Sequence, residues 1–129
     1  MKIFGVGVDV VDIKRIFVSF RKNKKFKERI FSSTEIKYCE SKKNKYAYYA
    51  KRFAAKEAFV KALGTGFSKG LSFKEIQIKN NKSGKPFINL TGKSLQIIKK
   101  ITKNRKIKIF LSLSDEAKYA IAMLVLAYK

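Results

Sequence analysis

The sequence contains no histidine and no tryptophan, and only one cysteine and one proline. Without histidine there can be no Ser-His-Asp triad, histidine-based metal cluster or HExxH zinc site, so catalysis would need carboxylates, lysines, hydroxyl groups or a bound metal ion. The single cysteine, Cys39, cannot form a disulfide within the chain, which favours a reducing, cytoplasmic setting. The apolar start is interrupted by Asp9, which argues against a signal peptide, and we expect no membrane span.

Acidic residues are also scarce, because 9 Asp and Glu stand against 31 Lys and Arg, a formal net charge of +22. Such a chain attracts anions, and the candidates are nucleic acid, an acidic protein, a phosphorylated cofactor or anionic lipid. Lysines that only decorate solvated faces explain the charge equally well. With 129 residues and 46% hydrophobic content, the chain is long enough for one packed domain, residues 1–129, and too short for two.

The first predicted element is a strand over residues 2–11, where side chains alternate between two faces. One face carries Gly5, Gly7 and Asp9, and two glycines beside an acid leave room for a ligand or for another backbone. The other face carries Phe4, Val6, Val8 and Val10.

Helical spacing follows in three segments. Asp12 can cap a helix over residues 13–20, and Ser32 with Glu35 forms a possible capping box for a short helix after a lysine-rich turn. The longest apolar stripe begins at Tyr46 and continues to Glu57 and Lys61, before Gly64 ends the helix.

The remainder of the chain reads mostly as β structure. Residues 73–79 and 86–90 flank a turn and predict a hairpin, a helix follows from near Thr91 to Asn104, and residues 107–113 and 119–127 predict two more antiparallel strands. The order strand, helices, hairpin, helix, hairpin favours an α+β fold.

Glu57 and Asp9 are the candidate chemical groups. A carboxylate on the buried stripe of a helix must be paired, bound to metal or neutralised, and two carboxylates with open positions suit Mg²⁺. The structural alternatives are a salt bridge from Glu57 to Lys61 and, for Asp9, a capping role at the following helix. The sequence does not show whether Asp9 and Glu57 meet.

Two glycine-containing segments are candidate phosphate sites. Residues 64–70 follow a helix, whereas a Walker loop precedes one, so this segment is not a Walker motif. Its backbone amides and Lys69 could still hold phosphate. A C-cap at Gly64 and a hairpin tip at residues 83–86 are the simpler explanations.

Two longer segments resemble motifs of the acyl-carrier-protein synthases. Residues 5–16, GVGVDVVDIKRI, are similar to that family's opening motif, and residues 52–66, RFAAKEAFVKALGTG, look like its most recognisable segment. Shorter similarities lie at residues 29–35, 84–86 and 111–120, so the resemblance covers nearly the whole chain. It implies a 4'-phosphopantetheinyl transferase fold, with a mostly antiparallel sheet packed against a long central helix.

The resemblance also implies a reaction. A serine of an acyl carrier protein would attack the β-phosphate of coenzyme A, and adenosine 3',5'-bisphosphate would leave, in the service of fatty acid biosynthesis. Asp9 and Glu57 would bind Mg²⁺, Glu57 or a bound water would take the serine proton, and Lys61 would stabilise or protonate the leaving phosphate. The residues implied to line the coenzyme site are Arg52, Lys56, Lys61, Gly64, Thr65, Gly66, Gly84, Lys85 and Pro86.

The resemblance further implies partners. The basic face of the first helix would receive the acidic carrier protein through Arg15, Arg21, Lys22 and Lys25, and typical members are homotrimers with active sites between subunits. The chain departs from many members at Phe110 and Asp115, where they carry histidine near the 3'-phosphate of coenzyme A.

Two other interpretations fit parts of the sequence. The high positive charge with interspersed Phe and Tyr is typical of nucleic-acid binding, although no recognised binding motif is present and we expect no nucleic-acid partner. A related transferase acting on a carrier domain of a larger synthase would share the chemistry and differ only in its partner.

Overall fold

The structure is a computed structural model that describes residues 1–66 and 70–129. Its elements, in chain order, are β1 (Lys2–Asp12), α1 (Ile13–Lys22), α2 (Phe26–Ile30), α3 (Ser33–Glu40), α4 (Lys45–Leu63), the 3₁₀ turn η1 (Phe73–Glu75), β2 (Ile76–Asn80), β3 (Pro86–Leu90), α5 (Gly92–Ile101), β4 (Ile107–Glu116) and β5 (Tyr119–Tyr128). The predicted α+β class is confirmed.

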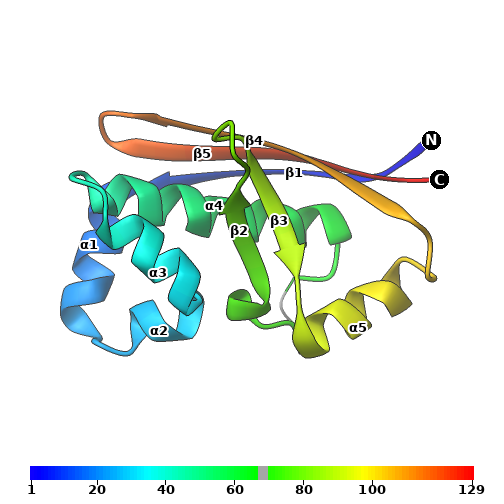
Figure 1. Cartoon of the computed structure of the whole chain (residues 1–129), viewed down its shortest axis with the longest axis horizontal. Coiled ribbons are helices and arrows are strands. Elements are labelled where there is room, and N and C mark those ends of the chain that lie inside the picture. Colours follow the sequence, from blue (N-terminus) through cyan, green and yellow to red (C-terminus); the bar gives the residue numbers. More distant parts are fainter. Residues whose placement is uncertain (67–69) are drawn as a thin grey trace.

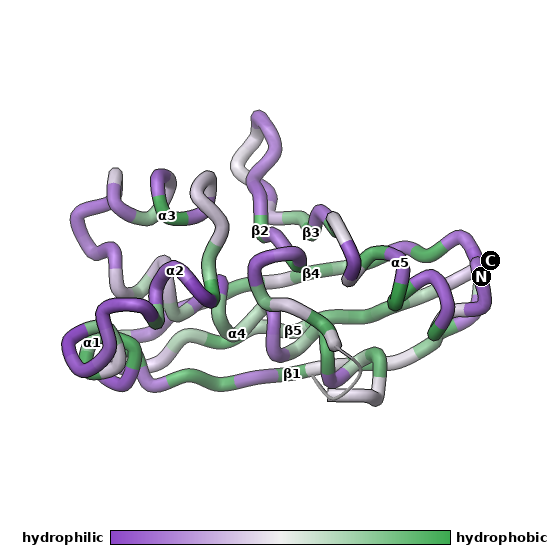
Figure 2. The backbone as a smooth tube through the Cα atoms, turned by 90° about the horizontal axis from the view of Figure 1, so that it is seen from below, coloured by the Kyte–Doolittle hydropathy of each residue, from purple (hydrophilic) through white to green (hydrophobic). Residues whose placement is uncertain are grey.

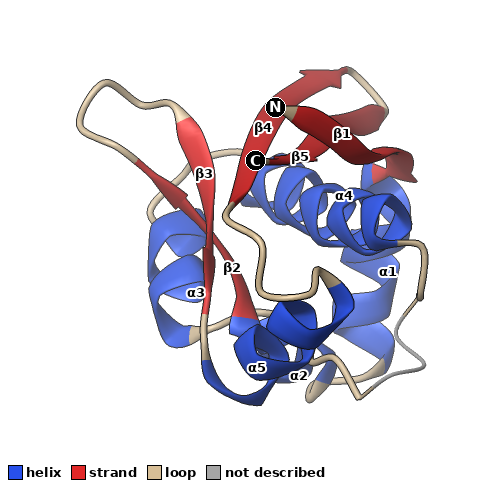
Figure 3. Cartoon of the chain, turned by 90° about the vertical axis from the view of Figure 1, so that its right-hand side faces the viewer, coloured by secondary structure: helices blue, strands red, loops and turns tan. Residues whose placement is uncertain are grey.

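The strands form two separate antiparallel units. A three-stranded sheet has the order β1-β5-β4, and β2 and β3 form a two-stranded hairpin. Helix α4 runs along the sheet, the other helices lie on the side of α4 away from the sheet, and the hairpin stands beside α4 next to β4 (Figures 1 and 3). Because Lys2 pairs with Tyr128, the two ends of the chain lie at the same end of the sheet.

Helix α4 is the centre of the core, as expected for a long central helix. Its side chains are mostly small or aromatic, and Tyr49, Ala54 and Phe59 have no exposed surface. A truncation such as Phe59→Ala in this position costs about 3–5 kcal/mol of stability. The remaining α4 residues with 0% exposure are Ala50, Ala55, Lys56 and Ala58.

Strand β1 touches α4 backbone to backbone. A Cβ atom at Gly5 would lie 1.9 Å from the carbonyl oxygen of Ala62, and one at Gly7 would lie 1.8 Å from that of Ala58. Two residues of strand span ~6.6 Å and one helical turn of four residues spans ~6 Å, so alternate residues of β1 meet successive turns of α4. Of the two uses that glycines here allow, the structure shows the approach of another backbone.

The valine face of β1 points away from α4. Val6, Val8 and Val10 are 53–60% exposed, and with Ile121 and Met123 of β5 they form the outer apolar face of the sheet. Hydrophobic residues recur along β1 and β5 in Figure 2. Phe4 leaves this face, because a bulge between Ile3 and Gly5 shifts the register and lets its ring pack against Tyr128.

The predicted caps are present. Asp12 accepts a hydrogen bond of 2.9 Å from the backbone of Lys14, and Ser32 and Glu35 form a capping box at α3. Gly64, with φ at +83°, ends α4. Helix α2 stands where the sequence predicted only a turn, and residues 73–75 form η1 in place of the start of a strand. No helix in the described parts of the chain has the length and apolarity needed to cross a membrane.

Candidate active site

Asp9 and Glu57 line one pocket, which has a volume of about 300 Å³. Gly5 packs on Ala62 and Gly7 packs on Ala58, so β1 runs along α4 at two residues of strand for each turn of helix. The next residue on this face of β1, Asp9, therefore lies beside the preceding turn of α4, which contains Glu57. This proximity could not be read from the sequence, because the two acids are 48 positions apart. The other residues that line the pocket are Val10, Val11, Arg15, Ile16, Ser19, Phe26 and Phe53.

Lys61 pairs with Asp9, and this differs from the salt bridge to Glu57 that helical spacing allowed. Its Nζ donates to Asp9 Oδ1 at 2.9 Å and to the carbonyl oxygen of Val8 at 3.0 Å. The side chain of Lys61 is 53% exposed, whereas that of Asp9 is 16% exposed. The alternative of Asp9 as a helix cap also fails, because Asp12 is the residue that caps α1.

The pocket shifts the protonation of Glu57. Burial raises the pKa of the Glu57 carboxyl group, the negative charge of Asp9 raises that pKa further, and Lys61 lowers it in part. Because the two carboxylates line the same pocket, their negative charges repel one another.

This pair fits a hard cation. Both side chains offer oxygen donors, their mutual repulsion is relieved by a positive ion, and two ligands leave positions for water or substrate phosphate, as Mg²⁺ requires. Among residues 1–66 and 70–129 there is no cluster of three or more Cys, Asp or Glu that would enclose a metal.

The basic face of α1 adjoins this pocket. Arg15 and Ser19 line both the carboxylate pocket and a shallower groove of about 360 Å³, which Lys22 also borders. Arg21 is exposed at the end of α1, with its guanidinium 5.6 Å from the Phe17 ring, and Lys25 is exposed just before α2. All four predicted carrier-binding residues therefore face solvent, and Arg15 also lines the pocket of the two acids.

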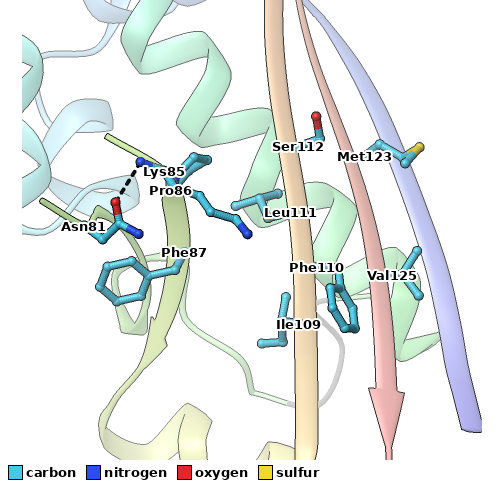
Figure 4. A pocket seen from close by; sticks show the side chains of 10 residues that line it. All are labelled: Asn81, Lys85, Pro86, Phe87, Ile109, Phe110, Leu111, Ser112, Met123 and Val125. Atoms are coloured by element: carbon cyan, nitrogen blue, oxygen red, sulfur yellow. Dashed lines mark hydrogen bonds between the residues drawn. The ribbon is translucent and has the colours of Figure 1, made fainter. Parts of the chain in front are cut away.

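The β2–β3 hairpin brings Gly84, Lys85 and Pro86 to a separate region. Lys85 and Pro86 line a pocket of about 410 Å³ between the hairpin and the edge of β4. Figure 4 shows Phe87 of the hairpin and Phe110 of β4 bordering this pocket. Gly84 takes a φ of +88°, which permits the tight turn at the hairpin tip.

Arg52 reaches the opposite side of the same hairpin. It is 3% exposed, its Nη2 donates to Asn80 Oδ1 at 2.7 Å, and its guanidinium lies 4.1 Å from the centre of the Tyr38 ring. Its Nε has no hydrogen-bond partner although it is buried. A cavity of about 460 Å³, which Lys79 and Lys82 also border, adjoins this guanidinium. A cavity bordered by Arg52, Lys79 and Lys82 suits an anionic ligand.

Lys56 is placed differently from the other predicted coenzyme residues. It is 0% exposed, and its Nζ donates to Glu35 Oε1 and to the carbonyl oxygens of Phe73 and Ile76. All three of its hydrogens are therefore used inside the chain. Burial lowers the pKa of Lys56 to about 8, although Glu35 opposes this effect.

The glycine turn after α4 has the geometry of a helix C-cap. The amide of Gly64 donates to the carbonyl oxygens of Val60 and Lys61, and Thr65 Oγ1 donates to the carbonyl oxygen of Gly66 at 3.0 Å. Lys69, the candidate phosphate ligand, lies outside the described residues. Asp115, where many family members carry histidine, accepts a salt bridge of 2.9 Å from Lys51.

The aromatic wall of the carboxylate pocket was missed in the sequence. Phe26 and Phe53 lie 6.4 Å apart between ring centres, and Phe53 stacks on Phe73 at 5.7 Å. The spacing of Phe26 and Ile30, four residues apart, was the signal for α2, but the surrounding lysines concealed it.

Comparison with known proteins identifies the class of protein to which this fold belongs. Residues 5–124 match the ACPS family of the 4'-phosphopantetheinyl transferase superfamily. The chain belongs to this superfamily, and the resemblance seen in the sequence is confirmed.

Individual relatives match over nearly their full length. The chain is 50% identical to a holo-(acyl-carrier-protein) synthase of Pelagibacter ubique over 129 residues, which cover 100% of both chains. The structure of the synthase from Neisseria meningitidis has a TM-score of 0.85 at 36% identity, covering 97% of this chain and 98% of that one. The synthase from Bacillus anthracis, solved in complex with CoA (3',5'-ADP), has a TM-score of 0.81 at 31% identity and covers 100% of both chains.

Proposed function

We propose that this chain transfers the 4'-phosphopantetheine group of coenzyme A to a serine of an apo acyl carrier protein, in a Mg²⁺-dependent reaction. The products are the holo carrier protein and adenosine 3',5'-bisphosphate. The relatives named above are holo-(acyl-carrier-protein) synthases, and one of them was solved with CoA (3',5'-ADP). The reaction serves fatty acid biosynthesis in the cytoplasm.

The observation that carries this proposal is the meeting of Asp9 and Glu57 in one pocket beside a cationic helix. Asp9 and Glu57 would hold Mg²⁺, which supplies charge stabilisation for a phosphoryl group when it is bound. The fit rests on the oxygen-only donor set and on the negative charge of Asp9, which adds to burial in raising the pKa of Glu57 and which a bound cation would offset.

The residues of the pocket have separate tasks in the transfer. The serine oxygen of the carrier protein forms a bond to the β-phosphorus of coenzyme A, and the bond from that phosphorus to the bridging oxygen breaks. Glu57, directly or through a bound water, takes the serine proton, and the bridging oxygen leaves with adenosine 3',5'-bisphosphate. Lys61, which is half-exposed beside Asp9, neutralises or protonates this leaving phosphate.

We assign the rest of the coenzyme to the segments around α4. The proposed contacts are Arg52, with its unsatisfied Nε, the turn Gly64-Thr65-Gly66, and the hairpin tip Gly84-Lys85-Pro86. In this proposal Lys56 does not contact the coenzyme, because its ammonium group already donates to Glu35 and to two backbone carbonyl oxygens. Phe110 supplies an apolar edge where many relatives carry histidine.

We place the carrier protein on α1. Arg15 lies where the basic groove and the carboxylate pocket meet, so an acidic helix docked on Arg21, Lys22 and Lys25 would bring its serine toward Glu57. Opposite charges of this kind raise the association rate and orient the partners.

We also propose a homotrimer with active sites between subunits. Support comes from the outer apolar face of the sheet, where Val6, Val8, Val10 and Met123 are each more than half exposed, because exposed apolar residues that gather on one face usually mark an interface. Light scattering of the purified protein checks the trimer.

Intact-mass analysis tests the reaction. An apo acyl carrier protein incubated with this protein, coenzyme A and Mg²⁺ should gain one phosphopantetheine, and a chelator added at the start should prevent the gain. An unchanged carrier mass with Mg²⁺ present would refute the activity. Full transfer in the presence of the chelator would refute only the proposed dependence on Mg²⁺. Parallel incubation with a carrier domain of a larger synthase identifies the preferred partner.

A further inference from the structure

Lys56 and Glu35 form an ion pair that is wholly buried. Neither side chain has exposed surface, and Lys56 Nζ lies 2.9 Å from Glu35 Oε1. The same ammonium group donates to the carbonyl oxygen of Phe73 at 2.7 Å and to that of Ile76 at 2.6 Å. One lysine on α4 therefore holds α3, η1 and the start of β2.

Glu35 completes this connection from the other side. Its Oε1 accepts from the backbone of Ser32 at 2.9 Å, and its Oε2 accepts from the backbone of Ile78 at 2.9 Å. The amide of Ile78 thus points at a carboxylate and is held only while Glu35 stays in place. A buried pair of charges survives at this position because every donor of Lys56 and both oxygens of Glu35 are satisfied.

The β2–β3 hairpin depends on such anchors. A two-stranded unit is at best marginally stable alone, and this one is not part of the three-stranded sheet. Along α4, Arg52 and Lys56 are one turn apart, and they contact Asn80 and Ile76 at the two ends of β2. The tip of the same hairpin carries Gly84, Lys85 and Pro86.

We propose that the Lys56–Glu35 pair positions the coenzyme-binding hairpin relative to Glu57. This inference rests on the proposed function, since it concerns the coenzyme side of the same site. Lys56 and Glu57 are consecutive on α4 and about 100° apart around its axis, so one residue anchors the hairpin while its neighbour faces the reaction. Lys56 is in this view a positioning residue and does not touch the coenzyme.

Three variants isolate this role. Lys56→Met removes the donors, Glu35→Gln removes the charge but keeps an acceptor, and the double variant removes the buried lone carboxylate that Lys56→Met leaves behind. We expect the KM for coenzyme A to rise about tenfold in Lys56→Met and in the double variant, and less in Glu35→Gln, because a displaced hairpin misplaces its ligand. The KM for the carrier protein should stay unchanged, since α1 lies outside this network.

Leu124→Ala is the matched control for lost stability. Leu124 is 0% exposed in β5 and makes none of the side-chain hydrogen bonds of the Lys56–Glu35 pair, so its truncation weakens the fold while the ion pair itself stays intact. All variants are assayed at a temperature where circular dichroism shows them folded. An equal rise in both KM values, a similar coenzyme effect in Leu124→Ala, or an unchanged KM in Glu35→Gln and the double variant would each overturn the proposal.

Amide hydrogen exchange tests the anchoring without any activity. Exchange at Ile78 should accelerate in the double variant and in Glu35→Gln, while the amides that pair β1 with β5 keep their protection. If the wild-type chain transfers nothing, the proposed function fails, and this measurement still decides whether the pair holds the hairpin. Unchanged exchange at Ile78 in both variants would refute the anchor.

Discussion

Lys61 Nζ donates a 2.9 Å hydrogen bond to Asp9 Oδ1, and thereby links one turn of α4 to the strand that carries the first acid. The same ammonium group lowers the pKa of Glu57, whereas Asp9 raises it. A lysine in this position serves as an internal counter-ion for the two carboxylates. A divalent cation bound by them must therefore displace or share this lysine.

Removal of that counter-ion should change metal binding and transfer in opposite directions. We expect Lys61→Met to bind Mn²⁺ about twofold to fivefold more tightly in the absence of coenzyme A, the range appropriate to a largely exposed ion pair. Phosphopantetheine transfer should nevertheless fall by about a hundredfold or more, because the leaving phosphate loses its cation. Electron paramagnetic resonance titration with Mn²⁺ measures the first effect, and intact-mass kinetics measure the second.

Lys61→Arg is the control, because it keeps the positive charge and should keep the wild-type Mn²⁺ affinity. Weaker Mn²⁺ binding by Lys61→Met than by the wild type would show that the lysine supports the metal and does not compete with it.

Glu57 should cost stability at neutral pH. A carboxyl group whose pKa is raised by folding contributes stability that is fully present below its ordinary value of 4.5 and is lost as pH rises through the folded-state pKa. Glu57→Gln removes this penalty, so the metal-free variant should melt at a higher temperature than the wild type at pH 7. The advantage should vanish below about pH 4.5. Differential scanning calorimetry at both pH values, with a chelator present, is the measurement.

The same variant should lose phosphopantetheine transfer at pH 7, as should Asp9→Asn, while both remain folded. A stabilised but inactive protein is typical of a site in which function opposes stability. A Glu57→Gln chain that melts at a lower temperature than the wild type at pH 7 would contradict the burial of this charge.

The contact between β1 and α4 predicts a severe effect of one added methyl group. Gly7→Ala places a Cβ atom where the carbonyl oxygen of Ala58 stands, so the two backbones must separate. We expect a loss of about 2–3 kcal/mol in the free energy of unfolding, measured by urea denaturation. Gln96→Ala, on an exposed position of α5, should change it by less than about 0.5 kcal/mol. A Gly7→Ala change as small as the control would mean that β1 can shift at no cost.

The sequence predicted local structure better than the site. Periodicity located the strands and the long helix, since side chains in contact with a core must repeat with the geometry of the element. The capping residues Asp12 and Ser32 were readable because they act on neighbours within three positions. Helix α2 was concealed because it is only five residues long and its three positions between Phe26 and Ile30 are all charged.

The meeting of Asp9 with Glu57 needed the structure. It depends on Gly5 and Gly7 fitting over α4, and glycines in a strand allow a ligand equally well as a backbone. The burial of Lys56 was also invisible, because its partner Glu35 is 21 positions away on another helix. The family resemblance supplied residue roles that spacing alone did not.

The carrier-binding surface predicts a charge-specific defect. Arg21 and Lys22 form an exposed basic pair in the last turn of α1, and Lys99 and Lys100 form a similar pair in the last turn of α5. Reversal of the first pair to Glu should raise the KM for an acidic carrier protein about tenfold at low salt, with the KM for coenzyme A unchanged, because the lost attraction acts only on the carrier. Reversal of the α5 pair changes the net charge equally.

That equality makes the α5 variant the decisive comparison. If the whole field of a chain with a net charge of +22 attracted the carrier, both reversals would weaken it alike. If α1 is the docking surface, the α5 variant keeps the wild-type KM, and the α1 defect shrinks as salt screens the contact over distances of about 10 Å at 0.1 M ionic strength. Kinetics for the two variants across a range of NaCl concentrations separate local docking from general attraction.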